Sequence, residues 1–410
     1  MRTVLRHPHG LLEVVTGASA GRLAVAPVVT ADRIRAALRR SRCDTGRRFV
    51  VRLATEQNRS TAVAQRPPIA SNQLLVSWNS ETDTTTYNSY HKNMFAMRPS
   101  AYSRWLLRGD DASNRIRSIW RIGVPIVATF VVGGIAVPGT VSQLFSLGTL
   151  SMAFVSNASF ALAALGALVL AARYLDHRPL RAYGFVFARA WWADLVAGVV
   201  VGGVLVGTAF GLAYRLEWVT VLDVWSTGDA GTFAGGIVLM LVIMLCVGFW
   251  EEAIFRGVVV TNVAEGLRTQ LSSPQALVGA WTVSTVLFGV VHLPLGTVPG
   301  DASPVGMLAV WLSLGGLLGL AYIFSGQLAL PIGIHFAVNY ATNSVFFGGD
   351  LFPTVLRTEI TAPELWHPIA GLTMVPGLLV AFGLVIAWCY WRRGESVLAV
   401  HISERPSRTP

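Results

Sequence analysis

The chain has 410 residues, of which 53% are hydrophobic and 13% charged, and its formal net charge is +10. This composition excludes an ordinary soluble globular domain and indicates a membrane protein. Residues 1–97 hold 14 Lys/Arg against six Asp/Glu, so eight of the ten net positive charges lie there. The remaining residues are close to neutral, and we therefore expect no nucleic-acid partner for the membrane-embedded part.

The cysteine pattern excludes two further classes of protein. Three cysteines, Cys43, Cys246 and Cys389, form neither an even-numbered framework nor a CxxC pair. The sequence therefore predicts neither a disulfide scaffold nor a thiolate zinc site.

Residues 1–97 form a basic segment in which short apolar pieces follow no sustained period. No apolar h-region follows a charged start, so the segment is no signal peptide. We predict a disordered cytoplasmic extension. We expect residues 1–93 to be dispensable for folding and membrane insertion. The alternative interpretation is a start codon assigned too far upstream, with Met94 or Met97 as the true first residue.

Beyond a basic juxtamembrane segment at 98–121, apolar stretches recur at lengths able to cross a bilayer, which takes about 20 residues. We predict about eight transmembrane helices, over 122–141, 147–175, 194–216, 233–256, 275–292, 306–324, 328–346 and 368–391. The fold class expected is an all-α polytopic membrane protein, with a core helical bundle that encloses an intramembrane cavity.

The charges of the loops predict the orientation of these spans. Arg residues gather after the second and fourth spans and in the C-terminal tail, whereas the loops 138–146, 217–232 and 293–305 contain no Lys or Arg. Eight spans with both termini in the cytoplasm satisfy the positive-inside rule. We therefore predict an integral protein of the cell (plasma) membrane with cytoplasmic N- and C-termini.

Two adjacent carboxylates, Glu251 and Glu252, end the apolar run of the fourth span. An acid at mid-helix costs about 2.5–3.5 kcal/mol on insertion scales, so such residues mark functional sites. Glu252 and Arg256 are four residues apart, with the acid first, the favourable order for an ion pair on one helical face. Glu251 lies about 100° further round the helix and is left without that partner.

Polar side chains in two other spans complete a candidate site. His292 closes the fifth span four residues after Phe288, and His335 and Asn339 share one helical face of the seventh. A single His or Asn in a span is often an interhelical hydrogen-bonder. Two acids, two His and one Asn in an otherwise apolar body instead favour one functional cavity, with Phe288 as a packing residue.

These residue types predict hydrolysis by activated water. A carboxylate can take a proton from water as general base beside an imidazole. A second imidazole and an amide can donate to a developing oxyanion, worth about 2.7–4 kcal/mol for one donor. No serine or cysteine stands in a recognisable nucleophile motif. His292, His335 and Glu251 also match a His2Glu zinc set, but HExxH is absent, so we predict no cofactor and keep zinc as the less favoured alternative.

Three motifs on successive hydrophobic segments resemble the signature of one family: Glu251-Glu252-x-x-x-Arg256, Phe288-x-x-x-His292 and His335-x-x-x-Asn339. The family is CPBP, the CAAX prenyl proteases and bacteriocin-processing proteins, also called Abi, which are intramembrane glutamic endopeptidases. The stretches 178–185 and 325–331 resemble further family sequences. The resemblance extends over about 175–346.

The resemblance implies an all-helical membrane protease whose conical cavity opens to the bilayer and the cytosol. Its substrate would be a membrane-tethered peptide or protein, prenylated or bacteriocin-like. The implied roles are Glu251 as base, His292 as its partner in activating water, His335 and Asn339 as oxyanion stabilisers, and Glu252, Arg256 and Phe288 as supporting residues.

The composition, the apolar stretches and the resemblance together predict four regions. Residues 1–97 are the extension, 98–216 the juxtamembrane segment and first three spans, 217–346 the catalytic helical core, and 347–410 the last span and basic tail. The alternative functions are a non-catalytic immunity or scaffold protein of the same family and, less favoured, a transporter. A transporter often has inverted repeats, and the sequence has no such internal symmetry.

Overall fold

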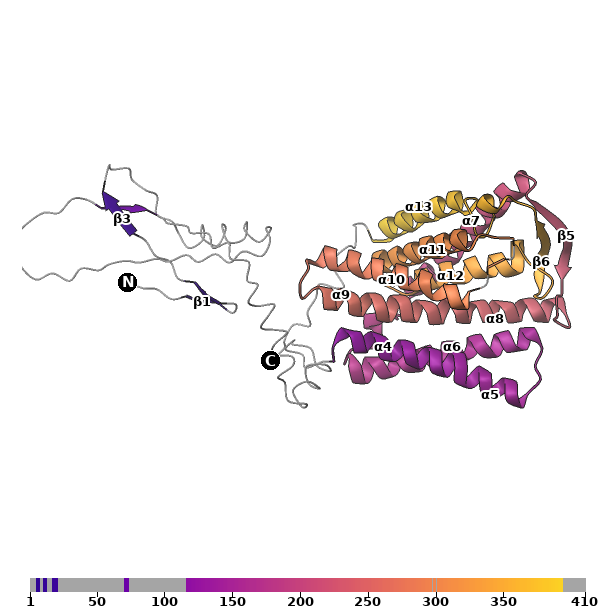
Figure 1. Ribbon diagram of the computed structural model, residues 1–410, viewed down its shortest axis with the longest axis horizontal. Helices are drawn as coiled ribbons and strands as arrows, with labels where there is room; N and C mark the ends of the chain where they lie inside the picture. Colours follow the sequence, from indigo (N-terminus) through magenta and orange to yellow (C-terminus); the bar gives the residue numbers. More distant parts are fainter. Residues whose placement is uncertain are drawn as a thin grey trace, which may run out of the picture. The chain divides into compact units, whose positions relative to one another are not determined.

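Figure 1 shows the computed structural model, which describes residues 116–296, 298–299 and 301–393 and four short strands nearer the N-terminus. The chain divides into two units, Met1–Met97 and Arg98–Pro410. In the first unit the strands pair antiparallel, β1 (Leu5–His7) with β2 (Gly10–Leu12) and β3 (Gly17–Ala20) with β4 (Ala70–Gln73). The rest of this segment lies outside the described residues, so its predicted disorder and the alternative start stay predictions.

Helices make up most of the second unit. In chain order they are α4 (Ser118–Ala128), η2 (Thr129–Ala136), α5 (Val137–Leu144), α6 (Thr149–Leu170), η3 (Ala171–Leu175), η4 (Leu180–Tyr183), α7 (Arg189–Arg215), α8 (Phe233–Glu252), η5 (Ala253–Val260), α9 (Thr261–Leu267), α10 (Ser273–Leu295), α11 (Pro304–Ser325), α12 (Ala329–Ala341), η6 (Thr342–Phe346), η7 (Glu364–Trp366) and α13 (Met374–Arg393). Several run on without a break, and η2, η3, η5 and η6 are π-helical stretches within such continuous helices.

Seven of the described helices are long and apolar enough to cross a membrane: Ser118–Leu144, Thr149–Leu175, Arg189–Arg215, Phe233–Leu267, Ser273–Pro294, Pro304–Ser325 and Met374–Arg392. Helices suit this setting because every backbone polar group in a bilayer core needs a partner within the segment. The predicted polytopic, all-α fold is confirmed, and the described part of this unit adds one two-stranded sheet.

The stretch predicted as the seventh span, 328–346, differs from the others. It forms α12, of 13 residues, continued by η6, and it is not among the seven long apolar helices. Residues 329–335 are all buried within the protein. His335 is therefore covered by protein, as an intramembrane polar group requires, whereas Asn339 is half-buried.

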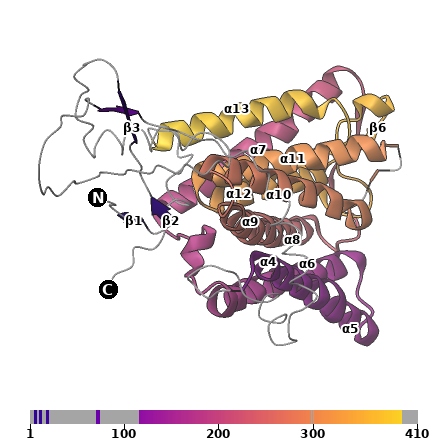
Figure 2. The same ribbon diagram turned by 60° about the vertical axis from the view of Figure 1, so that its left-hand side comes forward.

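The helices form layers that both views show in the same order (Figures 1 and 2). Helix α13 lies on one side and α4, α5 and α6 on the other. Helices α10, α11 and α12 lie between them, and α8 and α9 separate this middle layer from α4–α6. The buried core takes residues from α6, α7, α8, α10, α11, α12 and α13. Helix α12 packs against α8, and α10 packs against η5, the continuation of α8.

Glycines bring α7 and α12 into backbone contact. A Cβ added at Gly198 would lie 2.3 Å from the Leu330 carbonyl oxygen, and one at Gly333 would lie 2.2 Å from that of Leu195. Small residues allow such close approach between membrane helices. The lateral position of α12 is therefore set by α7.

A small sheet is formed by two connecting segments, one between α7 and α8 and the other between η6 and α13. Strands β5 (Val219–Ser226) and β6 (Thr354–Ile360) pair antiparallel, with Val219 opposite Ile360 and a register shift between Val221 and Asp223. It is built from loops that the charge pattern predicts to lie outside the cytoplasm.

Candidate active site

The adjacent glutamates stand where α8 passes into the π-helical stretch η5. Glu251 is 6% exposed and Glu252 fully buried, and every residue of η5 is buried. π-Helical turns within α-helices are frequent at functional sites. Helix α8 thus carries two carboxylates into the core of the protein.

The predicted ion pair between Glu252 and Arg256 is present. Glu252 Oε1 lies 2.9 Å from Arg256 Nη1, and both side chains are completely buried. Arg256 Nη2 also donates to the carbonyl oxygen of Gly315 in α11, at 2.9 Å. The guanidinium lies 4.5 Å from the ring centroid of Phe288, a cation–π contact. This arrangement compensates a buried charge with three kinds of partner.

Glu251 instead faces two imidazoles from other helices. Its Oε2 atom lies 3.6 Å from Nε2 of His292, near the end of α10, and 3.8 Å from Nε2 of His335 in α12. The His292 side chain is 18% exposed and that of His335 is 2% exposed. The structure therefore brings together three of the four predicted catalytic residues around one carboxylate oxygen.

Asn339, the fourth predicted catalytic residue, is half-buried and lies one helical turn beyond His335 on the same face of α12. Its backbone carbonyl oxygen accepts from Asn343 Nδ2 at 2.8 Å. Among the described residues, no hydrogen bond engages its side-chain amide. The amide thus remains available as a donor beside the imidazole of His335.

Hydrogen bonds at Nδ1 indicate which ring nitrogen of each histidine carries a proton. His292 Nδ1 lies 2.6 Å from the carbonyl oxygen of Phe288, which can only accept, so Nδ1 carries the proton. His335 Nδ1 donates in the same way to the Arg256-paired carboxylate of Glu252, at 2.8 Å. When a ring is neutral, its Nε2 is therefore the acceptor nitrogen, and this atom faces Glu251. Oε2 of Glu251 is buried and has no hydrogen-bond partner in the described part of the chain.

Aromatic rings line the site. Phe288 contacts both imidazoles, with ring centroids 4.6 Å from His292 and 5.7 Å from His335, and the His292 ring lies 5.2 Å from that of Trp311. Phe288 was predicted as a packing and supporting residue, and its contacts fit this description. The rings restrict the two imidazoles to orientations that face Glu251.

Sequence reasoning missed three contributors to the site. It paired Glu252 with Arg256 alone and did not predict its hydrogen bond to His335, 83 residues away. It also missed the Gly315 carbonyl and Trp311. The contacts of Gly315 and Trp311 come from α11, an apolar run without a polar or periodic signal that could have identified them.

No metal centre is formed by the described residues. The three atoms that could face an ion are Nε2 of His292, Nε2 of His335 and Oε2 of Glu251. In the described ranges, no group of three or more His, Cys, Asp or Glu is arranged to hold a metal. The zinc alternative gains no support from this geometry, and the predicted lack of a cofactor stays a prediction.

A cavity of about 350 Å³ lies elsewhere in the protein. It is lined by residues at the starts of α6 and α8, among them Thr149, Asp229, Thr232 and Leu239. Leu239 precedes Glu251 by twelve residues, about 18 Å along a helix. This cavity therefore belongs to the end of the helices where the sheet lies and is separate from the glutamate–histidine cluster.

Comparison with known proteins agrees with the three motifs. Residues 233–341 match the family model described as type II CAAX prenyl endopeptidase Rce1-like, a protease family. No curated protein and no solved structure matches the chain. The matched range begins at the first residue of α8, ends at the last of α12 and contains Glu251, Glu252, Arg256, Phe288, His292, His335 and Asn339. From α8 to α12, the chain is thus similar to the type II CAAX prenyl endopeptidases, as its motifs predicted.

Proposed function

We propose that this protein is an intramembrane glutamic endopeptidase, in which Glu251 and His292 activate a water molecule. The observation that carries the proposal is the approach of Glu251 Oε2 to His292 Nε2 at 3.6 Å in a nearly buried site. This gap is too long for an ordinary hydrogen bond, and a water molecule beside the pair could contact both atoms. Both facing atoms are acceptors, so the water would donate one proton to each.

The reaction follows from these acceptors. As the water oxygen attacks the carbonyl carbon of the scissile peptide bond, Glu251 takes one of its protons as general base. The carbonyl oxygen becomes an oxyanion in the tetrahedral intermediate. When the C–N bond breaks, the proton held by Glu251 passes to the leaving nitrogen. Water is consumed, and a carboxylic acid and an amine are formed.

His335 and Asn339 would stabilise the oxyanion. The Asn339 amide is a donor in any state, whereas His335 already donates from Nδ1 to Glu252 and can donate from Nε2 only as an imidazolium.

The substrate class follows from the surroundings of the site. The match to a CAAX prenyl endopeptidase model and the seven membrane-length helices support a membrane-tethered peptide or protein, prenylated or bacteriocin-like. We place the protein in the cell membrane with both termini in the cytoplasm, because the Arg-rich loops all fall on one side.

The variant Glu251→Gln tests the proposal, because it keeps the shape of the side chain and removes the proton acceptor. We expect cleavage of a membrane-tethered peptide library to fall by about 10²–10⁴-fold, with an unchanged melting temperature. Glu359→Gln, an exposed glutamate on β6, is the matched control and should cleave normally. Normal cleavage by Glu251→Gln would overturn the hydrolytic scheme. A cellular phenotype that survives Glu251→Ala would favour the scaffold function.

A further inference from the structure

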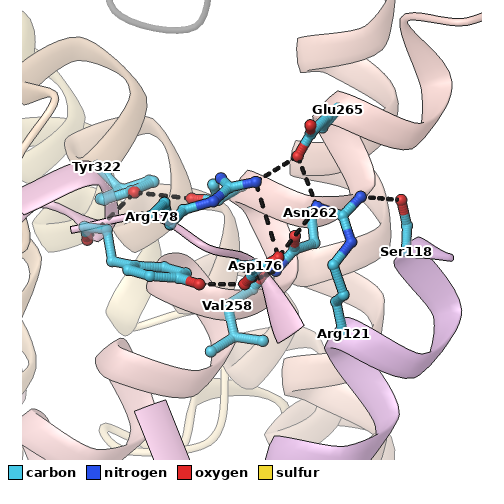
Figure 3. Close-up of polar contacts among 10 residues, drawn as sticks. Ser118, Arg121, Asp176, Arg178, Val258, Asn262, Glu265 and Tyr322 are labelled. Carbon is cyan, nitrogen blue, oxygen red and sulfur yellow. Dashed lines mark hydrogen bonds and ion pairs between the residues drawn. The ribbon is translucent and has the colours of Figure 1, made fainter. Parts of the chain in front are cut away.

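A buried polar cluster surrounds the loop that joins η3 to α7, and this loop precedes the family-matched residues (Figure 3). Asp176, whose side chain has no exposed surface, is its centre. Oδ1 of Asp176 lies 3.0 Å from Arg121 Nη1 in α4 and 3.7 Å from Arg178 Nη2. Both arginines also pair with Glu265 in α9. The cluster balances two cations with two anions and ties together three separate parts of the chain.

The second oxygen of Asp176 holds the next part of the loop. Oδ2 accepts from the Tyr183 hydroxyl and from Asn262 Nδ2. Burial raises the pKa of Tyr183 above its ordinary value of 10, and Asp176 raises it further, so the hydroxyl stays protonated and keeps donating. Tyr183 is thereby fixed to the ends of α4 and α9 through a network that is almost entirely buried.

The backbone that follows contacts the turn between α11 and α12. The Tyr183 carbonyl oxygen accepts from the Tyr322 hydroxyl at 3.3 Å, and the Gly184 carbonyl oxygen accepts from Leu328 N at 3.1 Å. Gly184 has a φ of +97°, and a Cβ there would lie 2.8 Å from Leu328 N. Only glycine meets both conditions without strain. The close contact between residue 184 and the start of α12 therefore requires glycine at this position.

Leu328 is the N-cap of α12, the helix that carries His335 two turns further on. A helix transmits a displacement of its first turn along its axis, because successive turns are hydrogen-bonded to one another. Glycine contacts with α7 hold α12 laterally, whereas the Gly184 contact opposes movement along the axis. His335 must keep its 2.8 Å bond to Glu252 while Nε2 faces Glu251.

We propose that residues 176–185 are a positioning element of the active site, which holds the start of α12 and thereby sets where the His335 imidazole lies. Only the expected effect on the rate of cleavage rests on the proposed function. The structural consequence, the state of the His335 ring, can be measured whether or not the protein cleaves peptides.

The test uses the full chain in lipid bilayers with ¹⁵N-labelled histidine, and the His335 resonances are assigned by their loss in His335→Gln. Gly184→Ala should shift or broaden the His335 imidazole resonances and leave those of His367 unchanged. In the cleavage assay, kcat should fall by up to about 10²-fold, the cost of a misplacement of about 1 Å, with little change in KM.

The matched control is Gly228→Ala, another glycine of positive φ, +52°, whose added Cβ would lie 2.7 Å from a backbone oxygen, that of Leu351. This variant should lose thermal stability without a change at His335. The proposal is overturned if both variants alter the His335 resonances equally, or if Gly184→Ala leaves them as in the wild type.

If Gly184→Ala fails to fold, the same measurement is made on Tyr322→Phe, which removes only the hydroxyl that donates to Tyr183. Unchanged His335 resonances in that variant would again overturn the proposal. If the wild-type protein cleaves no peptide, the proposed protease function is contradicted, whereas the proposed positioning role of residues 176–185 is not.

Discussion

The two adjacent glutamates show how neighbouring residues of one type can have different environments. Glu252 is completely buried and bonds both Arg256 and His335 through Oε1. Glu251 faces two imidazoles at 3.6 and 3.8 Å, beyond the length of an ordinary hydrogen bond. This difference is the reason why we propose Glu252 as a supporting residue and Glu251 as the general base.

Glu252→Gln is therefore expected to destabilise the protein, because it leaves Arg256 buried without its counter-ion. Removing one partner of a buried pair costs about 3–5 kcal/mol, which a lower melting temperature would show. Glu252→Gln combined with Arg256→Met should recover part of the loss, since no unpaired charge remains. A Glu252→Gln protein that melts as the wild type but cannot cleave would exchange the roles of the two glutamates.

The environment of His367 leads us to expect that the stability of the folded protein depends on pH. Its fully buried ring accepts two backbone N–H groups at Nδ1, those of Ile369 and Ala370, each at 3.2 Å. Burial lowers the pKa of His367 below its ordinary value of 6.5, although Asp301, 3.5 Å from Nε2, opposes the shift. As the pH falls, the unfolded chain therefore binds this proton first.

The stabilisation by neutral His367 is thus complete above pH 6.5 and declines as the pH falls through the lowered pKa of the folded state. His367→Asn keeps an acceptor near the position of Nδ1 but cannot titrate. Melting temperatures from pH 8 to pH 5 should fall more steeply for the wild type than for this variant. Parallel curves would show that His367 does not contribute to the acid sensitivity.

At the scale of elements, the burial and position of α12 are determined by the helices that pack against it. Helix α12 is not among the membrane-length helices, yet its first seven residues are all buried. Backbone contacts with α7 make this possible, because glycines replace side chains where the two helices cross. The active-site residues of α12 are thereby presented on a firmly packed helix.

Gly198→Ala should disturb this crossing, since the added Cβ would lie 2.3 Å from the Leu330 carbonyl oxygen. Overpacking of this kind costs about 1–3 kcal/mol, and thermal unfolding in detergent would measure it. The matched control is Gly203→Ala on the same helix, where nothing lies within 4 Å of the added atom. Equal melting temperatures for the two variants would contradict the tight crossing.

At the scale of the whole molecule, the predicted orientation can be tested by labelling. In a cysteine-free background, we expect a cysteine at Arg181 to react with a membrane-impermeant maleimide only after cell lysis. A cysteine at Glu364 should react in intact cells, because the charge pattern places 347–367 outside. Both positions are exposed, so access depends on the side of the membrane. Labelling of the Arg181 position in intact cells would reverse the orientation.

Local signals in the sequence determined several features by themselves. The long apolar runs identified the membrane helices, because a bilayer demands a fixed length of continuous hydrophobic residues. The four-residue spacing of Glu252 and Arg256 predicted their ion pair, because helix geometry alone brings such residues together. The spacing within each polar motif likewise identified the faces that carry His292 and His335.

Only the tertiary structure decided how these faces meet. The hydrogen bond from His335 to Glu252 joins residues 83 apart, and the contact of Gly184 with Leu328 joins two loops without any shared period. The burial of α12 depends equally on glycines in α7 that align with it in space. Such contacts depend on how separate helices pack. A pattern along the chain indicates which face of a helix carries polar residues, whereas helix packing determines which residues that face contacts.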